Sequence, residues 1–427
     1  MQSDILSDLT WRGLVYQSTD PLRLQELLAS KATTLYAGFD PTADSLHVGH
    51  MMALMILRRF QRAGHRPIAV VGGATGMIGD PSGKSAERNL LSVETLRENV
   101  AAIETQMRRF LDFDRSNMPA LLVNNFDWMR RFSYLDFLRD IGKSFPVGAM
   151  LAKDSVKSRL EREESGLSYT EFSYMLLQAY DFVHLCQQYD CELQVGGSDQ
   201  WGNITAGIDL GRRMLSRQLY GMTTPLLTKS DGGKMGKTES GAVWLSPERT
   251  SPYAFYQYWI NVADADAGTC LRFLTELPHE EIERLDRSRE DEPHRRESQK
   301  ALAVELTRLV HGDAGLAKAQ KATEVFFGAA IDDLTDAELG EIFVDVPSAQ
   351  ATRGELAAGL GLIDAMVRVG LAKSNGEARR TIGQGGAYVN NRRRGEDDAT
   401  LTTADLASET TIVLRSGKRK YALLRLV

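Results

Sequence analysis

The stretch 41–50, Pro41-Thr42-Ala43-Asp44-Ser45-Leu46-His47-Val48-Gly49-His50, joins an expected buried strand to an expected helix. The strand is Thr34–Phe39, a short β-branched and aromatic run that Asp40-Pro41 ends. The helix covers residues 51–63, which are mostly apolar and precede Gly64, and Asp44 or Ser45 is expected to cap it. A strand that leads through a short loop into a helix is typical of an α/β fold.

His47 and His50 lie three residues apart at the start of this helix and so point the same way, while Gly49 leaves the surface between them bare. The N–H groups at a helix start favour anions, and a missing side chain lets a base or ribose approach closely. The pair therefore indicates a phosphate and ribose site. The alternative is a pair of ordinary structural histidines, whereas a zinc site would require further ligands that the sequence does not place in a metal-binding pattern.

Length and composition describe a globular chain of several domains. The 427 residues suggest two to four domains, 43% of the residues are hydrophobic, and no apolar run is long enough to cross a membrane. Residues 1–8 are acidic and lack the features of a signal or transit peptide, so we expect a cytoplasmic protein. Cys186, Cys191 and Cys270 have neither metal nor disulfide spacing, which agrees with a reducing compartment.

Charge is unevenly distributed along the chain. The formal net charge is −6, but residues 353–427 carry 13 lysines and arginines against 8 acidic residues. A basic C-terminal part indicates contact with RNA, although such charge is also common on ordinary solvated surfaces.

Strands and helices alternate in the first half of the chain. Further strands are expected at 68–71, 121–123 and 192–195, separated by helices such as 93–110 and 134–141. This alternation predicts a parallel sheet with helices on both faces. The glycine-rich loops 38–40, 72–76 and 196–200 each follow a strand, and parallel strands end at one shared edge, so we expect the loops to form one ligand site.

The helix expected at 169–185 carries a polar row, Tyr174, Gln178 and Asp181, spaced by four and three residues on one face. Such a row is usually solvated. Here apolar residues surround it almost completely, which predicts a helix buried all round. A buried carboxylate requires a hydrogen-bond partner, so the row would suit a ligand with a hydroxyl and an ammonium group.

The segment 226–238 contains Lys234-Met235-Gly236-Lys237-Thr238 within a glycine-rich stretch. Two lysines among glycines predict a cationic loop for phosphates, and an ordinary flexible surface turn is the alternative. The phosphate interpretation gains weight from the histidine pair at 47 and 50.

These motifs together resemble a known family. The spacing of 41–50 resembles the first signature of class I aminoacyl-tRNA synthetases, with Val48 in place of the usual isoleucine. Residues 234–238 resemble the second signature, with Gly236 and Thr238 where serines are usual. With Tyr36, the polar row and the loop 196–200, the chain closely resembles the bacterial tyrosyl-tRNA synthetases over essentially its whole length.

The resemblance implies an activity in two steps. The family activates L-tyrosine with ATP, whose phosphates carry Mg²⁺, to give tyrosyl-adenylate and pyrophosphate. It then transfers tyrosine to the 3′ end of tRNA(Tyr). L-tyrosine, ATP and tRNA(Tyr) are thus the expected partners, and no metal ligand set and no tightly bound cofactor are expected.

The resemblance also assigns residues. Tyr36 and Asp181 would bond the phenol hydroxyl, and the other expected tyrosine-binding residues are Tyr174, Gln178 and Asp80. The expected catalytic residues, which meet the phosphates as the bond breaks, are Thr42, His47, His50, Lys84, Arg88, Lys234, Lys237 and Thr238. The expected ATP-binding residues are Gly38, Asp40, His47, Gly49, His50, Gly196, Asp199, Gln200 and Lys237. Catalysis would rest on positioning and charge stabilisation.

The expected organisation is a Rossmann-like catalytic domain at 1–240, a helical anticodon-side domain at 241–330, a linker at 331–353 and an α+β RNA-binding domain at 354–427. The linker is predicted from the Pro/Ser/Ala stretch 346–350. The last domain resembles a small module first seen in a ribosomal protein, with short helices at 362–370 and 374–382 before a turn into strands. Its expected tRNA contacts are Arg379, Arg380, Arg392, Arg393 and Arg394.

Three alternatives stay open from the sequence. A tryptophan-specific relative would share the sheet and both signatures, although Asp181 and Tyr36 favour a phenol. A non-catalytic RNA-binding paralogue would not need the intact histidines and lysines of the two signatures. A nucleotidylyltransferase acting on a small acid would account for the first motif but not for the RNA module. The family also implies a homodimer in which one tRNA spans both subunits, with contacts from residues 125–150.

Overall fold

The computed structural model describes residues 4–81, 92–115, 117–153, 156–157, 167–238, 241–331, 334–344, 346–395, 399–417 and 420–427. The chain divides into two compact units. The first consists of Met1–Thr250 with Tyr258–Val310, and the second of Ser251–Gln257 with His311–Val427.

The first unit is built on a six-stranded sheet in the order β1-β6-β5-β2-β3-β4. Its strands are β1 (Gln17–Ser18), β2 (Thr34–Phe39), β3 (Arg66–Val71), β4 (Leu121–Asn124), β5 (Cys191–Gly197) and β6 (Tyr220–Thr224). Neighbouring strands are parallel except for β1, which runs antiparallel to β6 at the edge. The predicted parallel sheet is therefore confirmed, with one antiparallel edge strand added.

Two strands of this sheet, β1 and β6, have no counterpart in the sequence prediction. β1 has only two residues, too few for a periodic pattern. β6 is buried throughout but contains Gly221, and a Cβ there would lie 2.4 Å from Cγ2 of Ile204 in helix α10 (Trp201–Leu215). The glycine that weakens the strand signal thus lets α10 pack closely on the sheet.

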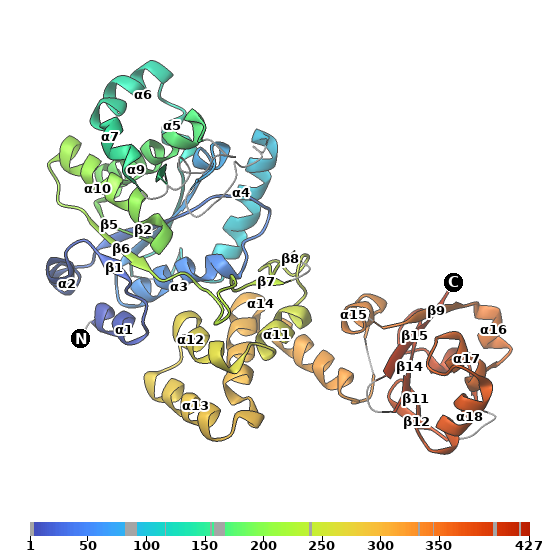
Figure 1. Ribbon diagram of the computed structural model, residues 1–427. Coiled ribbons are helices and arrows are strands. Elements are labelled where there is room, and N and C mark those ends of the chain that lie inside the picture. The colour runs from blue at the N-terminus through green and yellow to red at the C-terminus, as the bar shows by residue number, and fades with distance from the viewer. Residues whose placement is uncertain are drawn as a thin grey trace. The chain divides into compact units, whose positions relative to one another are not determined.

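Helices lie on both faces of the sheet (Figure 1). Including α10, the helices of this part of the chain are α1 (Ile5–Trp11), α2 (Pro21–Ser30), α3 (Val48–Arg62), α4 (Val93–Met107), α5 (Phe126–Met129), α6 (Tyr134–Asp140), α7 (Val147–Leu151) and α9 (Tyr169–Tyr189). The ring of Phe182 on α9 packs edge-on against that of Tyr36 on β2, with 5.2 Å between centroids. One face of α9 therefore lies against the strand that leads into residues 41–50.

A helical region follows the sheet, as predicted. The hairpin β7 (Lys237–Thr238) and β8 (Gly241–Ala242) precedes α11 (Pro252–Ile260), α12 (Asp264–Leu274), α13 (His279–Asp291) and α14 (Glu297–Phe326), which Gly312 interrupts. The buried guanidinium of Arg59 on α3 donates to the carbonyl oxygens of Phe273 at 2.9 Å and Thr275 at 2.6 Å. A cation at the carbonyl end of a helix is favourable, so α12 anchors the far end of α3.

The second unit contains a five-stranded sheet in the order β12-β11-β14-β15-β9. Its strands are β9 (Ser348–Ala351), β11 (Ala387–Val389), β12 (Arg392–Arg394), β14 (Thr411–Ser416) and β15 (Lys420–Leu426), and β10 (Leu360–Gly361) pairs separately with β13 (Thr400–Leu401). The helices are α15 (Asp336–Ile342), α16 (Arg353–Ala357), α17 (Leu362–Arg368) and α18 (Asn375–Gly383). α17 and α18 confirm the two short helices predicted before the strands.

The predicted linker at 331–353 is wrong where the structure describes it, because α15 and β9 lie within it. Thr335 and Glu338 form a capping box at the start of α15, and Leu339 is fully buried. β9 pairs in parallel with β15 although its sequence, Ser-Ala-Gln-Ala, lacks β-branched residues. Pairing with a neighbouring strand, rather than local preference, makes this segment a strand.

Among the described residues, no helix combines the length and the apolar character needed to cross a lipid bilayer.

Candidate active site

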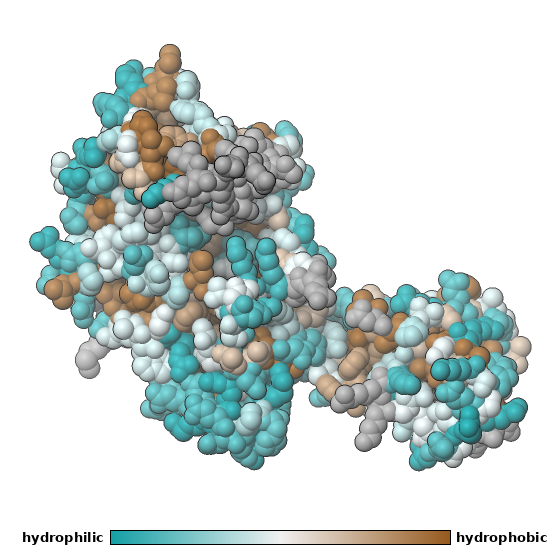
Figure 2. Space-filling model, in the orientation of Figure 1, coloured by the Kyte–Doolittle hydropathy of each residue, from teal (hydrophilic) through white to brown (hydrophobic). Residues whose placement is uncertain are grey.

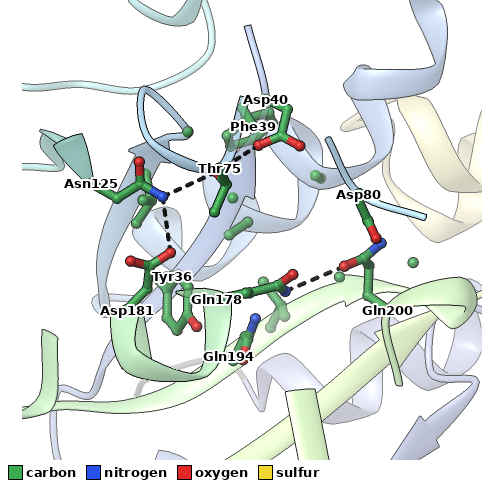
Figure 3. Close-up of a pocket in the computed structure, with 18 of the residues that line it drawn as sticks. Tyr36, Phe39, Asp40, Thr75, Asp80, Asn125, Gln178, Asp181, Gln194 and Gln200 are labelled. Carbon is green, nitrogen blue, oxygen red and sulfur yellow. Dashed lines mark hydrogen bonds between the residues drawn. The ribbon is translucent and has the colours of Figure 1, made fainter. Parts of the chain in front are cut away.

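The carboxyl ends of β2, β3 and β5 surround a pocket of about 270 Å³ (Figure 3). The three glycine-rich loops therefore meet at one sheet edge, as predicted. Twelve predicted site residues line the pocket: Tyr36, Gly38, Asp40, Thr42, His50, Asp80, Tyr174, Gln178, Asp181, Gly196, Asp199 and Gln200.

One end of the pocket is formed by Asp181 of α9 and Tyr36 of β2. The Asp181 carboxylate, 3% exposed, accepts hydrogen bonds from Trp128 Nε1 at 2.8 Å and from Asn125 Nδ2 at 3.1 Å. Burial raises the pKa of Asp181 to about 7, although both hydrogen bonds act to lower it. The buried Tyr36 hydroxyl has no hydrogen-bond partner among the described residues. This end would suit a ligand hydroxyl that can bond to both groups.

A chain of hydrogen bonds leads from Asp181 toward Asp40 (Figure 3). Besides bonding Asp181, Asn125 Nδ2 donates to Thr75 Oγ1 at 3.0 Å, and Thr75 Oγ1 donates to Asp40 Oδ1 at 2.8 Å. The second oxygen of Asp40 accepts from the Tyr174 hydroxyl at 3.1 Å. The position of Asp40 is thus coupled to that of Asp181.

Amide side chains form a second polar group in the pocket. Gln178 Nε2 donates to Gln200 Oε1 at 3.3 Å, and Gln200 Nε2 donates to Asp80 Oδ2 at 2.7 Å. The Oε1 atoms of Gln178 and Gln194 are buried and have no hydrogen-bond partner in the described part of the chain. These oxygens would accept from a ligand N–H group, since an unpaired buried acceptor is costly.

Three polar residues that line the pocket, Thr75, Asn125 and Gln194, were not named individually among the predicted site residues. Neither was Trp128, which bonds Asp181 without lining the pocket. Thr75 lies in the loop 72–76, and Asn125 follows β4 directly, so the rule of strand ends could have found both. Gln194 is a polar residue inside an apolar strand, which is also a signal. No sequence signal marks Trp128, because its contact with Asp181 depends on the position of the four-residue helix α5.

The first turn of α3 is capped by His47, so the prediction of Asp44 or Ser45 as the cap is wrong. His47 Nδ1 accepts from the Gly49 N–H at 3.0 Å. The Ser45 hydroxyl instead donates to the Leu46 carbonyl at 2.7 Å, and Asp44 pairs with Arg249. Histidine is not among the residues preferred at this position, which is why the sequence pointed elsewhere.

The histidine pair is held in a defined orientation. His50 Nδ1 accepts from the His47 N–H at 3.1 Å, and the two rings stack with 4.0 Å between centroids. Because both Nδ1 atoms are acceptors, the hydrogen of each neutral ring lies on Nε2, where it can be donated to a phosphate oxygen. A Cβ on Gly49 would lie 2.8 Å from the His47 ring. The position of that ring therefore requires a residue without a side chain at 49, in agreement with the bare surface predicted there.

The two signature segments contact each other at Gly236 and Val48. Gly236 has φ +80°, and a Cβ there would lie 2.6 Å from Val48 Cβ. Val243 N–H donates to the Gly236 carbonyl at 2.7 Å, and Val48 N–H donates to the Val243 carbonyl at 3.0 Å. The absence of a side chain at 236 therefore brings the lysine-bearing loop against the start of α3.

The remaining predicted phosphate contacts are only partly described. Lys234 and Lys237 are exposed on either side of Gly236. Of Thr238 only the backbone, in β7, is described, and Lys84 and Arg88 lie outside the described residues.

Comparison with known proteins identifies the family. Residues 28–328 match the model of class I tRNA synthetases for tryptophan and tyrosine, and residues 338–424 match the C-terminal domain of tyrosine–tRNA ligases. The chain is 61% identical over 425 residues to the tyrosine–tRNA ligase of Rhodopirellula baltica, covering 99% of this chain and 97% of that protein. The chain belongs to the tyrosine–tRNA ligases. A second member of this family, from Roseiflexus castenholzii, is 54% identical over 424 residues and covers 99% of both chains.

Solved structures agree with membership of the tyrosine–tRNA ligases. A C-terminally truncated mitochondrial tyrosyl-tRNA synthetase of Coccidioides posadasii superposes with a TM-score of 0.66 at 35% identity, covering 75% of this chain and 91% of that one. The tryptophanyl-tRNA synthetase of Plasmodium falciparum, at 16% identity and a TM-score of 0.53, shares the fold alone. The tyrosine branch is thus confirmed over the tryptophan-specific alternative.

The C-terminal domain that marks the tyrosine–tRNA ligases presents the predicted arginines. Arg379 and Arg380 on α18 are exposed, as are Arg392 and Arg393 on β12. Arg394 is also exposed but forms an ion pair with Asp405, which neutralises part of its charge.

Proposed function

We propose that the chain activates L-tyrosine with ATP and then transfers tyrosine to the 3′ end of tRNA(Tyr). The carrying observation is the phenol end of the pocket, where a buried carboxylate and an unpaired buried hydroxyl, Asp181 and Tyr36, lie within the lining of one cavity. Tyrosine supplies a hydroxyl that donates to the carboxylate and accepts from Tyr36. Phenylalanine lacks this hydroxyl and so leaves the Asp181 carboxylate and the Tyr36 hydroxyl without that hydrogen bond. An unpaired buried polar group costs about 1–3 kcal/mol.

The rest of tyrosine would extend toward the amide groups. Tyr174, Gln178 and Asp80 would hold the ammonium group, for which the unpaired Gln178 Oε1 is an acceptor. The substrate carboxylate is then directed toward Gly38, Asp40 and the loop 196–200. Among the described residues, no other atom lies within 4 Å of a Cβ placed on Gly38, so the adenosine of ATP could lie directly against the backbone there.

Activation proceeds by attack of a tyrosine carboxylate oxygen on the α-phosphorus of ATP. The bond from the α-phosphorus to the bridging oxygen breaks, and pyrophosphate leaves with its Mg²⁺, which enters as part of the ATP substrate. His47 and His50 would donate from Nε2 to phosphate oxygens, and Lys234 and Lys237, with Thr42, Lys84, Arg88 and Thr238, would stabilise the charge that develops on pyrophosphate. Donors fixed before the reaction cost little reorganisation in the transition state.

The C-terminal part would bind the tRNA. The small α+β domain carries exposed cations suited to phosphate contacts: Arg379, Arg380, Arg392 and Arg393. Arg394 would join them after exchanging its ion pair with Asp405 for one with RNA.

We assign residues 241–330 to the anticodon side of the tRNA. We place the protein in the cytoplasm.

A second copy of the chain would cover an apolar face of the first unit. Six large apolar side chains are exposed on α6, α7 and the start of α9: Tyr134, Leu135, Leu138, Val147, Leu151 and Tyr169. Figure 2 shows hydrophobic residues gathered over α6. Leu135, 74% exposed, would be buried in a homodimer, so Leu135→Glu should yield monomers in sedimentation velocity. A wild-type protein that sediments as a monomer would overturn the dimer.

The test of the activity is amino-acid-dependent exchange of labelled pyrophosphate into ATP, with tyrosine, phenylalanine and tryptophan compared in parallel. We expect exchange with tyrosine alone. Exchange with tryptophan at a comparable rate would contradict the phenol pocket, and no exchange with any of them would favour the non-catalytic RNA-binding alternative.

A further inference from the structure

We propose that Tyr258 is a positioning residue for the activation step, because its hydroxyl fixes the loop that carries Lys234 and Lys237. The inference rests on the proposed function, in which these two lysines stabilise the leaving pyrophosphate. Tyr258 lies on α11, away from the pocket lining, and neither signature includes it.

The Tyr258 hydroxyl bonds to two consecutive residues of the loop. It accepts from the Gly236 N–H at 2.7 Å and donates to the Met235 sulfur at 2.9 Å. Met235 is 5% exposed, whereas Lys234 and Lys237 on either side are exposed. One hydroxyl oxygen thus anchors the centre of the loop, and the two cationic side chains remain exposed.

The opposite side of Gly236 is fixed by α3. The glycine packs against Val48, and its carbonyl accepts from Val243, whose own carbonyl accepts from the Val48 N–H. Gly236 is therefore held between the first turn of α3, which carries the histidines, and the Tyr258 hydroxyl. Removing one of the two contacts would free the loop on one side while the other persists.

The tyrosine itself is well placed to hold the loop. Its ring packs edge-on against the fully buried Trp259, with 4.9 Å between centroids. Burial raises the pKa of Tyr258 to about 12, so the hydroxyl keeps its hydrogen at neutral pH and can donate and accept at once. Phenylalanine would retain the ring packing and lose both bonds.

The two reaction steps depend on this loop differently. The lysines contact pyrophosphate only while ATP is being cleaved, and pyrophosphate has left before tyrosine moves to tRNA. A loop held less firmly should therefore slow adenylate formation and leave transfer unchanged. General destabilisation of the protein would impair both steps.

The experiment compares Tyr258→Phe with Tyr256→Phe, which removes the hydroxyl of a buried tyrosine of the same helix. Three quantities are measured: the single-turnover rate of adenylate formation, the dissociation constant for tyrosine, and the rate of transfer from preformed adenylate. For Tyr258→Phe we expect the first to fall about tenfold, the size of one to two net hydrogen bonds, with the other two within a factor of two of wild type. Tyr256→Phe should match wild type in all three.

Met235→Leu tests the same contact from the other side, since it removes the sulfur acceptor and keeps an apolar side chain of similar size. It should slow adenylate formation by a smaller factor and again spare transfer. Normal adenylate formation in Tyr258→Phe, or an equal loss in both steps, would overturn the proposal. A wild-type protein that forms no tyrosyl-adenylate would instead overturn the proposed function, so the two failures are distinguishable.

Discussion

Replacing Tyr36 by phenylalanine should stabilise the protein without ligand and weaken its preference for tyrosine. The Tyr36 residue is 1% exposed, and its hydroxyl has no partner within the described ranges. A buried unpaired hydroxyl costs about 1–3 kcal/mol, and Tyr36→Phe removes that cost while keeping the ring packed against Phe182. The free energy of unfolding should therefore rise by about 1 kcal/mol in the absence of tyrosine.

The same substitution removes one hydrogen bond from bound tyrosine. A net hydrogen bond contributes about 0.5–1.5 kcal/mol, so kcat/KM for tyrosine should fall roughly threefold to tenfold. Phenylalanine as a substrate makes no hydrogen bond to residue 36, and in the variant it no longer leaves a buried Tyr36 hydroxyl unpaired. The ratio of kcat/KM for tyrosine to kcat/KM for phenylalanine should therefore fall by about tenfold or more.

The assays are urea unfolding with and without tyrosine, and pyrophosphate exchange with tyrosine and phenylalanine. Leu35→Val, at a buried position of the same strand that is not part of the pocket lining, controls for general effects on β2. The reasoning is refuted if Tyr36→Phe is less stable than wild type without ligand, or if the ratio of kcat/KM values for the two amino acids does not change.

Two further predictions follow from the pocket and the loop. Since burial raises the pKa of Asp181 to about 7, and the ionised form is the better acceptor, the dissociation constant for tyrosine measured without ATP should rise toward tenfold per unit as pH falls below about 7. The free energy of unfolding without ligand should fall as pH rises from about 4 to about 7, because the folded state binds the Asp181 proton more tightly than the unfolded state does. Asp181→Asn should abolish both pH trends. Gly236→Ala, whose Cβ would meet Val48, should slow adenylate formation about a hundredfold in a single-turnover assay. Gly232→Ala, at a similar φ of +84° but with no described atom within 4 Å of its Cβ, should lower stability alone. Equal rates of adenylate formation in the two variants would show that contact with Val48 is unimportant.

The sequence predicted the parts of the site that repeat a local pattern. The strand Thr34–Phe39 was predicted to the residue, because its β-branched and aromatic composition and Asp40-Pro41 define both ends. Tyr174 and Asp181 followed from helical spacing, since seven residues are close to two turns and place both on one face. The meeting of the glycine-rich loops followed from a property of parallel sheets, independent of side-chain detail.

Two of the features that the sequence did not predict, the role of Trp128 and the strand β9, depend on contacts between distant segments, and a third, the His47 cap, is local. Trp128 bonds Asp181 only because α5 is packed near α9, and a four-residue helix has no periodicity to show this. The His47 cap depends on a ring nitrogen that reaches the Gly49 N–H, which residue preferences do not favour. β9 is a strand only because β15 is beside it. For Trp128 and β9, tertiary structure overrides a weak local signal.

The pocket holds polar groups without the hydrogen bonds or the pKa that they would have in water, and this makes the pocket selective for its ligand. The Asp181 carboxylate has a raised pKa, and Tyr36 and Gln178 each hold an unpaired polar atom away from solvent. A ligand that satisfies all three relieves a cost already present in the free protein, whereas one lacking the phenol hydroxyl leaves part of it in place. Because hydrogen bonds through Asn125 and Thr75 connect Asp181 to Asp40, occupation of the phenol end also fixes a carboxylate on the ATP side. Recognition of the amino acid and arrangement of the reacting groups are therefore served by one hydrogen-bond network.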